Sequence, residues 1–523
     1  MSKSVSIDNS KANPAEWLRT YPDVMIGAGL ALLTVLARLP FQSQVLYHWD
    51  SVNFAFALDR FDIEAGQPHV PGYILYVLLG QMVNALVGDP QTTLVLISVI
   101  ASALAVAALY LLGRDLFSRA TGLAAALLLA SSPLFWFYGE IALPHTLDTL
   151  MVVLSVWLLY RIMKGDRTLV WPAAVALGVA GGLRPQTLLF LAPLALFAGR
   201  KLDLKRAVGG VAVLGVVCLA WFIPLVMNVG GLDRYSAIMG AYTASFNFLD
   251  SSAGLARNLR KLVMYTLYGG LAALLPAVVY AVAWLRRLRP ATLARRERFW
   301  FLVIAAGPSL LFYTVVHMGQ QGLIFVYLPA LLLAGAEGLR RLTAKADAKR
   351  FTALLAVLIA ANAAIFLLAP TYPLGEDSFK LLTWRTVQDN DAYYRSRFDA
   401  IQASFSPENT VVMASNWRHV QYYLPGYRRV ADDIAGAWAE IASAPLQNTS
   451  YALTAEDISV LPDAERPATV ILFDPELANY AQNRDALDRL DLADGDSLYS
   501  LTLDEGDVLR IDIEGIRLER PAS

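Results

Sequence analysis

The chain has 523 residues, of which 56% are hydrophobic and 17% charged, and its mean hydropathy is +0.46. Apolar runs long enough to cross a bilayer recur from residue 22 to residue 369, which indicates a multi-pass membrane protein and excludes an ordinary soluble globular chain. The net charge of −1 says nothing about partners, because basic and acidic residues collect in different loops. The single cysteine, Cys218, excludes a disulfide framework and a cysteine-based metal site.

The polar first 21 residues lack the apolar stretch and small-residue cleavage site of a cleaved signal peptide, so we expect 1–21 to be a cytoplasmic tail. Within the apolar region, "GGLRPQ" contains glycines and a proline that break any single helix, and it predicts a tight pair of short helices. The apolar runs cover 22–39, 70–88, 91–113, 120–138, 143–160, 170–183, 186–199, 207–229, 262–284, 299–316, 322–339 and 351–369.

The distribution of Lys and Arg predicts eleven spans, because basic residues favour cytoplasmic loops. Most basic residues fall on the cytoplasmic side if the N-terminus is inside and 70–88 stays at the outer interface as a re-entrant or interfacial helix. If 70–88 crossed, every later loop would change sides and the bias would invert. Pro71 and Gly72 open this segment, and Gln81 and Asn84 interrupt its apolar face, which suits an interfacial helix better than a span.

We therefore predict an all-α polytopic membrane domain at 22–369, with interfacial helices in a first outer loop at 40–90. The last span leads outside, so residues 370–523 form an extracytoplasmic soluble domain of α/β or α+β type. Within it, "NTVVMAS" and "ATVILFD" predict buried strands, "WRHVQYYL" a helix, and "LYSLTLDEGDVLRIDIEG" a strand, a turn and a strand. The domain carries no glycine-rich phosphate loop or other catalytic motif that sequence inspection reveals.

The first outer loop, "YHWDSVNFAFALDRFDIEAGQPHVPGYILY", places acids and histidines among aromatics where the chain first leaves the lipid. Its apolar spacing predicts a short helix on the bilayer surface, with Asp50 at the N-cap. Asp50 either only caps this helix or acts as a general base at the boundary of water and lipid, supported by His48 and His69. A hydroxyl nucleophile needs such a base, because its proton must leave as the new bond forms.

Three further polar residues lie at or near membrane exits. Glu140 is the second candidate catalytic acid; it could bind an acceptor, orient a base, ligate a cation or form a structural pair. Asp148 must face the bundle interior, because a carboxylate facing lipid costs roughly 2.5–3.5 kcal/mol, and His145 is its candidate structural partner. Arg184 is either a cation that stabilises developing phosphate charge or a snorkelling interfacial arginine.

These segments resemble the GT-C superfamily of glycosyltransferases, especially the bacterial relatives of protein O-mannosyltransferases and aminoarabinose transferases. "WDSVNFAFALDRFD" followed by "QPHVPGYILYVLLG" is similar to their first outer loop, in which an early acidic residue precedes a "HPPGYPLY"-type stretch. "GRDLFSRATGLAAALLLASSPLFWFYGEIALPHTLDTL" is similar to their next helical pair, and "HMGQQGLIFVYLPALLLAGAEGL" to a late segment. The sequence departs from the pattern at Val70, where relatives often have proline.

The resemblance implies a multi-pass enzyme of a bacterial inner or plasma membrane that moves a hexosyl or pentosyl unit, as a mannosyltransferase does. The donor is a polyprenyl-phosphate sugar, the acceptor is a hydroxyl of a protein, lipid or glycan on the non-cytoplasmic face, and the transfer inverts the anomeric centre. Asp50 matches the family's catalytic acid, and no nucleic-acid partner is expected. The candidate substrate-binding residues are His48, His69, His145, Asp148, Arg184, Gln186, His317 and Gln320.

Three alternatives remain open at this point. The set His48, Asp50, His69, Glu140 and His145 also suits Mn²⁺ or Zn²⁺. No compact ligand motif such as HExxH is present, and protein O-mannosyltransferase-like enzymes generally need no metal, so no cofactor is expected. A membrane transporter or lipid flippase could instead use a polar intramembrane cavity, although the internal repeats typical of transporters are not visible, and a non-catalytic assembly protein is a third class.

Overall fold

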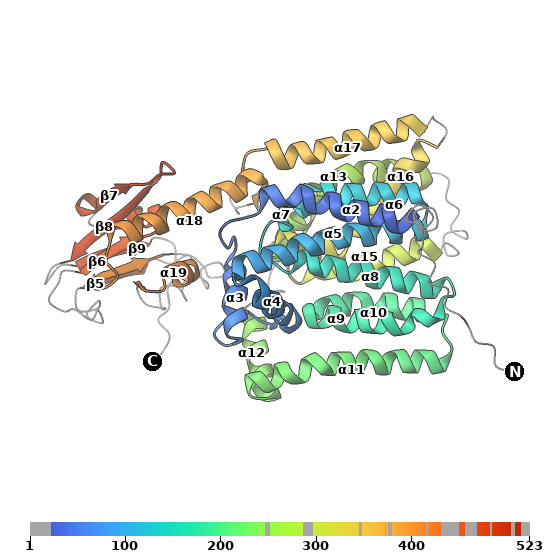
Figure 1. Cartoon of the computed structure of the whole chain (residues 1–523), viewed down its shortest axis with the longest axis horizontal. Coiled ribbons are helices and arrows are strands. Elements are labelled where there is room, and N and C mark those ends of the chain that lie inside the picture. The colour runs from blue at the N-terminus through green and yellow to red at the C-terminus, as the bar shows by residue number, and fades with distance from the viewer. Residues whose placement is uncertain are drawn as a thin grey trace, which may run out of the picture.

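The structure is a computed structural model of the chain (Figure 1). The predicted tail at 1–21 lies outside the described residues. The residues that the structure describes are 22–245, 252–285, 297–344, 348–371, 373–374, 379–414, 417–429, 449–454, 468–481, 484–503 and 508–513.

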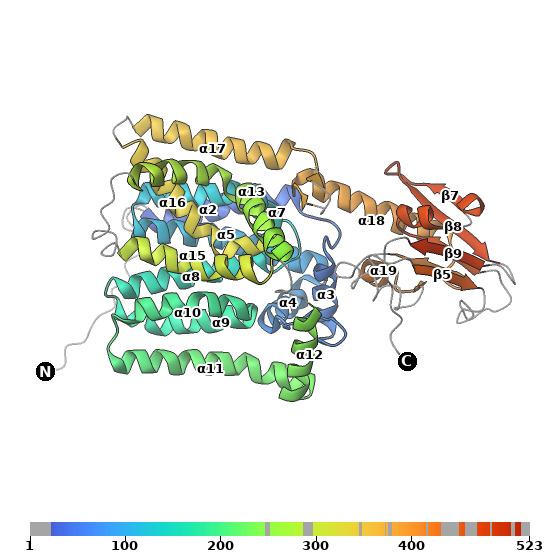
Figure 2. The same cartoon turned by 180° about the vertical axis from the view of Figure 1, so that it is seen from behind.

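Long helices run side by side in a bundle, and a smaller part with strands lies beyond one end of it (Figures 1 and 2). Three shorter helices, α3 (Trp49–Asp59), α4 (Ile74–Val87) and α12 (Leu232–Ser245), gather at the bundle end that faces this smaller part. The other helices of the bundle are α2 (Pro22–Arg38), α5 (Pro90–Leu116), α6 (Arg119–Ser131), α7 (Pro133–Tyr138), α8 (His145–Met163), α9 (Val170–Leu183), α10 (Pro185–Gly199), α11 (Leu204–Val229), α13 (Ser252–Leu285), α15 (Glu297–Val315), α16 (Leu328–Leu342) and α17 (Ala348–Leu368).

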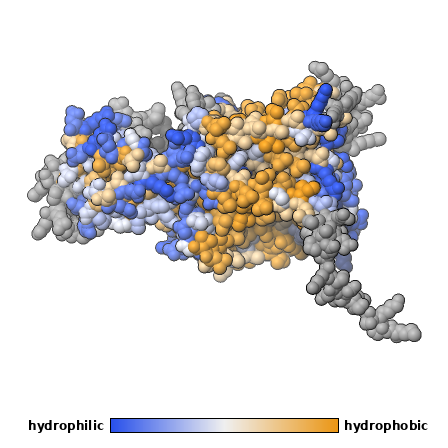
Figure 3. Space-filling model, turned by 45° about the horizontal axis from the view of Figure 1, so that its top comes forward, coloured by the Kyte–Doolittle hydropathy of each residue, from blue (hydrophilic) through white to orange (hydrophobic). Residues whose placement is uncertain are grey.

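The outer surface of the bundle is apolar, as Figure 3 shows for one face, and hydrophilic residues cover much of the smaller part. This surface and the fold indicate a multi-pass membrane protein. The predicted number of eleven spans stays a prediction, because length and composition alone do not place a helix across a bilayer. The described helices that are long and apolar enough to span are Pro22–Phe41, Pro90–Leu116, His145–Met163, Leu204–Val229, Gly254–Ala283, Glu297–Val315 and Ala348–Leu368, and shorter apolar helices cover Ile74–Val87, Arg119–Ser131, Arg167–Leu183 and Pro185–Gly199.

Proline and glycine decide where several helices end. The predicted pair at 170–199 is confirmed: α9 ends at Leu183, Arg184 is extended, and Pro185 occupies the first turn of α10. The predicted helix at 120–138 is interrupted instead, because Ser132 leaves the helical conformation and caps α7, which Pro133 opens. The stretch between the apolar runs 207–229 and 262–284 also contains helix, since α12 and the first turns of α13 lie within it.

The short helix in the first outer loop is confirmed as α3, but the prediction of its cap is wrong. His48 is the N-cap, and its Nδ1 accepts a hydrogen bond from the backbone N–H of Asp50 at 3.0 Å. Most of α3 is also buried against its neighbours, so it is not a helix with one face on a surface. Because His48 caps the helix, the carboxylate of Asp50 is available for other contacts.

The C-terminal part contains a long helix, α18 (Trp384–Ser404), that the sequence did not predict. The helix at "WRHVQYYL" is confirmed as α19 (Trp417–Tyr423). A five-stranded mixed sheet has the order β4-β3-β6-β8-β7: β3 is parallel to β4 and β6, and β8 is antiparallel to β6 and β7. The strands of this sheet are β3 (Thr410–Met413), β4 (Arg428–Arg429), β6 (Ala468–Leu472), β7 (Asp488–Asp491) and β8 (Ser497–Leu503).

The predicted buried strands are thus confirmed as β3 and β6. The predicted terminal strands are β8 and β9 (Val508–Ile513), but they do not pair with each other: β8 joins the large sheet, and β9 pairs with β5 (Thr449–Thr454). The described part also contains a minimal two-stranded ladder of β1 (Pro373–Leu374) and β2 (Phe379–Lys380).

Candidate active site

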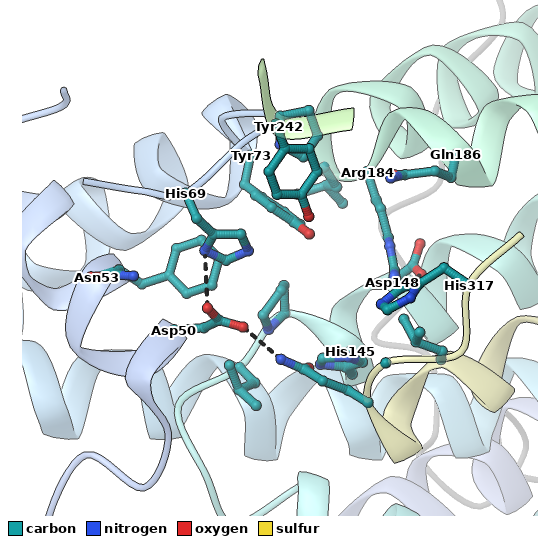
Figure 4. Close-up of a pocket in the computed structure, with 18 of the residues that line it drawn as sticks. Asp50, Asn53, His69, Tyr73, His145, Asp148, Arg184, Gln186, Tyr242 and His317 are labelled. Carbon is teal, nitrogen blue, oxygen red and sulfur yellow. Dashed lines mark hydrogen bonds and ion pairs between the residues drawn. The ribbon is translucent and has the colours of Figure 1, made fainter. Parts of the chain in front are cut away.

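A cavity of about 480 Å³ lies where the first outer loop meets the bundle. Its lining comes from segments far apart in the sequence: α3, the turn before α4, the start of α8, the junction of α9 and α10, α12, and the end of α15 with the loop that follows it (Figure 4). Of the predicted site residues, those that line the cavity are Asp50, His69, His145, Asp148, Arg184, Gln186, His317 and Gln320.

Asp50 lies at one side of this cavity. Its carboxylate accepts a hydrogen bond from the side-chain amide of Gln320 at 2.5 Å, and its other oxygen lies 3.3 Å from Nδ1 of His69. His48 does not line the cavity, but its Nδ1 lies 3.4 Å from the carboxylate. Asp50, the second residue of α3, therefore contacts His69 in the turn before α4 and Gln320, which lies 270 positions later in the chain.

These neighbours set the charge state of the pair. Burial by itself would raise the pKa of Asp50, but His69, His48 and the hydrogen bond from Gln320 together lower it below its ordinary value. Burial lowers the pKa of His69, against the opposing effect of Asp50. At neutral pH, Asp50 is therefore ionised and His69 is neutral, so the cavity presents a carboxylate that can accept a proton.

An ion pair lies across the cavity from Asp50 (Figure 4). Arg184, at the extended junction of α9 and α10, points one Nη at a carboxylate oxygen of Asp148, 3.4 Å away, and the hydroxyl of Thr187 donates to the other oxygen at 2.7 Å. The prediction that Asp148 faces the interior is confirmed, since it is 4% exposed. Its polar partners are Arg184 and Thr187, not His145.

Several polar atoms around the cavity have no hydrogen-bond partner among the described residues. They include Nε of Arg184, Oε1 of Gln186, Nδ1 of His145 and the hydroxyl of Tyr313. Buried polar groups are normally paired, so unpaired groups that converge on one cavity indicate a polar ligand. Gly322 leaves room for the ring of His145, because a Cβ added at this glycine would collide with that ring.

Glu140, predicted as a second catalytic acid, lies away from this lining. It is fully buried, and its Oε1 lies 3.9 Å from Nε of Arg38, which is also fully buried. Arg38 also donates to the backbone oxygen of Ala130 at 2.9 Å and lies over the ring of Trp136. The structure therefore separates Glu140 from the residues that gather around Asp50, and a catalytic role for it stays a prediction.

The sequence analysis missed three tyrosines of the cavity. Figure 4 shows that Tyr73 and Tyr242 point into it from the turn before α4 and from α12. Tyr313 lines it from α15. Tyr73 lies within "HVPGYILY" and has φ of 43°, a left-handed conformation that is uncommon outside glycine. Tyr242 gave no signal because it lies between two apolar runs, 207–229 and 262–284, and Tyr313 because it lies within the apolar run 299–316.

Among the described residues, no three His, Cys, Asp or Glu side chains come together in a way that could hold a metal ion. The expectation that no metal is required stays a prediction.

The fold and the cavity define a polytopic helical membrane protein with a polar site at one end of its bundle. Residues 69–228 match the family described as dolichyl-phosphate-mannose-protein mannosyltransferase. This stretch includes His69, His145, Asp148 and Arg184 but begins after Asp50. No protein with a curated description matches the chain.

The fold is similar to that of ArnT from Cupriavidus metallidurans. The crystal structure of ArnT bound to undecaprenyl phosphate matches with a TM-score of 0.59 and 13% identity, covering 94% of this chain and 98% of ArnT, and the apo structure matches with a TM-score of 0.58. The apo oligosaccharyltransferase from Archaeoglobus fulgidus matches with a TM-score of 0.49 and 14% identity, covering 86% of this chain and 73% of that one.

The predicted resemblance to GT-C glycosyltransferases is confirmed, because the family match falls on the segment that carries part of it and ArnT shares the fold over nearly the whole chain. Together these matches support a multi-pass membrane glycosyltransferase of the GT-C type. The sugar and the acceptor do not follow from them.

Proposed function

We propose that this protein moves a sugar from a polyprenyl-phosphate donor to an acceptor hydroxyl on the non-cytoplasmic face of the membrane, with inversion at the anomeric carbon. One observation carries the proposal: an ionised carboxylate, Asp50, shares a cavity with the buried Arg184, whose Nε lacks a partner among the described residues. ArnT, which shares the fold, was crystallised with undecaprenyl phosphate, and this supports a lipid phosphate as part of the donor.

The two sides of the cavity suit the two ends of such a reaction. The acceptor oxygen attacks the anomeric carbon while Asp50 takes the hydroxyl proton, and the bond from that carbon to the phosphate oxygen breaks. The electron pair leaves with the polyprenyl phosphate, which gains negative charge. Arg184 would stabilise this charge, and Asp148, which accepts a hydrogen bond from Thr187, holds the guanidinium in place. A single displacement of this kind inverts the anomeric centre.

The location of the site suits substrates from two phases. A polyprenyl chain keeps the donor in the bilayer, while a polar acceptor arrives from water. The cavity is lined by α3, α12 and the turn before α4, and these elements lie at the end of the bundle that faces the C-terminal part (Figure 1). This position would let the lipid tail stay among the helices while the acceptor reaches Asp50 from outside.

The test is sugar transfer in membranes supplied with radiolabelled polyprenyl-phosphate sugars. Asp50→Asn should lose about 10²–10⁴-fold in rate at unchanged folding, because the acceptor proton would have no base. Asp59→Asn is the matched control, since Asp59 is an exposed residue at the end of the same helix. Full transfer by Asp50→Asn would contradict the proposed base. A wild-type protein that moves intact lipid-linked sugar but transfers none would favour a flippase.

The face of the membrane has a separate test. Asp89 is exposed and caps α5, close to the cavity end of the bundle. In a Cys218→Ala background, Asp89→Cys should react with an impermeant thiol reagent added from the non-cytoplasmic side. Reaction from the cytoplasmic side alone would contradict the proposed face and the eleven-span topology.

A further inference from the structure

The segment that leads into α3 has no regular secondary structure, and its backbone is held by the C-terminal part. The N–H groups of Gln44 and Val45 donate to the two carboxylate oxygens of Asp391, at 2.8 and 3.0 Å. The hydroxyl of Ser43 donates to the same carboxylate at 3.1 Å. One carboxylate of α18 thus binds three consecutive residues that lie almost 350 positions earlier in the chain.

The next residue is held from both sides. The N–H of Leu46 donates to the hydroxyl of Tyr423 at 2.9 Å, and its carbonyl oxygen lies 2.8 Å from Nε2 of His419. Both partners belong to α19. The three N–H groups of residues 44–46 and the carbonyl oxygen of Leu46 therefore bond to side chains of α18 and α19, where regular secondary structure would provide backbone partners.

The partners are themselves fixed. Asp391 is 8% exposed and His419 is 1% exposed, and the His419 ring stacks on Tyr394 with centroids 4.3 Å apart. The side chain of Val45 is 2% exposed and belongs to the hydrophobic core of the C-terminal part, with Tyr394 and Phe398. A residue of the first outer loop thus completes the core of a domain that begins more than 300 residues later.

A second contact holds the other half of the loop. The guanidinium of Arg418 donates to the carbonyl oxygen of Ala65, in the turn that precedes His69. On α3 itself, the ring of Trp49 meets that of Trp417 edge-on with centroids 5.3 Å apart, and Trp49 lines the cavity. The C-terminal part therefore touches the segment before Asp50, the helix that carries it and the turn before His69.

We propose that Asp391, His419 and Tyr423 are positioning residues, through which the C-terminal domain holds the first outer loop so that the carboxylate of Asp50 meets His69 and Gln320. The inference rests on the proposed role of Asp50. Asp50 is five residues beyond Val45, and His69 is four residues beyond Ala65. A shift of Val45 would therefore move Asp50, and a shift of Ala65 would move His69. A displacement of about 1 Å can cost about 10²-fold in rate.

The test uses the full chain and compares Asp391→Ala with Asp389→Ala. Asp389 is the matched control, because it is on the same helix, is exposed and pairs with Arg385 and Thr371, not with the first loop. Asp391→Ala should lower kcat by about 10²-fold and leave the KM for the donor unchanged, since Arg184 and Asp148 keep their places. The control should leave both constants unchanged.

Tyr423→Phe keeps the test decisive if Asp391→Ala fails to fold. It removes one hydroxyl while the ring retains its stack on Phe398, and it should lower kcat in the same direction by a smaller factor. Rates are expressed per folded molecule, measured by monodisperse elution in detergent. Unchanged kcat in folded Asp391→Ala or in Tyr423→Phe would overturn the inference, as would a loss explained wholly by less folded protein.

The pH profile separates positioning from general damage. His48, His69, His145 and Gln320 lower the pKa of Asp50 in the held loop, so a loosened loop should move the acid limb of kcat/KM to higher pH. A variant that is merely less stable would keep the wild-type limb. Asp50→Asn, measured alongside, separates the two proposals. If it transfers sugar normally, the role of Asp50 fails; if it is inactive while Asp391→Ala keeps the wild-type kcat and profile, only the positioning fails.

Discussion

Asp50 and Glu140 are both acids at membrane exits, and the folded chain gives them opposite environments. Asp50 lines a cavity among residues that can exchange protons or bind a polar ligand. Glu140 is sealed in the bundle beside Arg38, with no hydrogen-bond partner for its carboxylate oxygens among the described residues. Both are carboxylic acids at predicted membrane exits, so the difference shows that the packed fold, and not the local sequence, decides which acid reaches the cavity.

The largest expected effect is on the stability of the folded protein, and it tests the contrast between Glu140 and Asp50. Glu140→Gln should lower the free energy of unfolding by about 3–5 kcal/mol, because it leaves the charge of Arg38 buried and unpaired. Thermal unfolding in detergent measures the loss, and transfer per folded molecule should stay near wild type. A double variant, Arg38→Met with Glu140→Gln, should recover much of the stability. Stable Glu140→Gln protein that has lost transfer would break the contrast and return Glu140 to the catalytic candidates.

The next effect is on donor use. Arg184→Ala should lower kcat/KM for the lipid-linked sugar by about 10²–10³-fold, as expected when a stabilising group for developing charge is lost. Asp148 would then lack its cation, so Arg184→Ala combined with Asp148→Asn controls for that buried charge. Arg234→Ala is the surface control, because Arg234 pairs with Glu64 in an exposed position. Equal losses of stability and donor use would instead favour an arginine that only anchors the α9–α10 junction.

The pH dependence should be weak on the acid side. The rate falls when Asp50 is protonated, so the limb lies at its pKa in the folded protein, which is below the ordinary value of about 3.9. Stability permitting, kcat/KM should therefore not fall between pH 8 and pH 5 because of Asp50. A fall in kcat/KM near pH 6 that Asp50→Asn abolishes would contradict this. It would show that burial raises the pKa of Asp50 by more than His69, His48 and Gln320 lower it.

The smallest expected effect is that of metal removal. Transfer in excess EDTA should be unchanged, as the resemblance to protein O-mannosyltransferase-like enzymes implies. Activity that stops in EDTA and returns with Mn²⁺ or Mg²⁺ would contradict this and would give the carboxylate and histidines around Asp50 a further role as ligands.

Much of the helical architecture was predictable, because the apolar runs had the length and the breakers of helices. The pair around Pro185 was predicted within a residue or two. The break at Pro133 was not, because the two serines before it, Ser131 and Ser132, stand between the apolar stretches 127–130 and 134–138, which together resemble one continuous apolar run. In the C-terminal part, strands β3 and β6 followed from their hydrophobic patterns, while α18 has a polar surface that gave no clear periodicity.

The candidate site was predicted less evenly. Asp50 and His69 were selected because an acid beside histidines at the boundary of water and lipid suits a general base, and Arg184 because a cation there suits a leaving phosphate. The cap of α3 was assigned to Asp50 on residue preference, but the ring nitrogen of His48 occupies that position. Tyrosines gave no comparable signal, since an aromatic residue near a membrane interface is ordinary.

By itself, the sequence determined the class of protein, the course of most helices and the supply of acids, histidines and arginines. Only the tertiary structure decided which of them meet, because the partners come from distant segments: Gln320 reaches Asp50 across 270 positions, and Asp391 reaches Val45 across 346. A local pattern records helix and strand preferences, which act over a few residues. Hydrogen bonds and charge pairs act over a few ångströms in space, and only the packed fold brings such groups together.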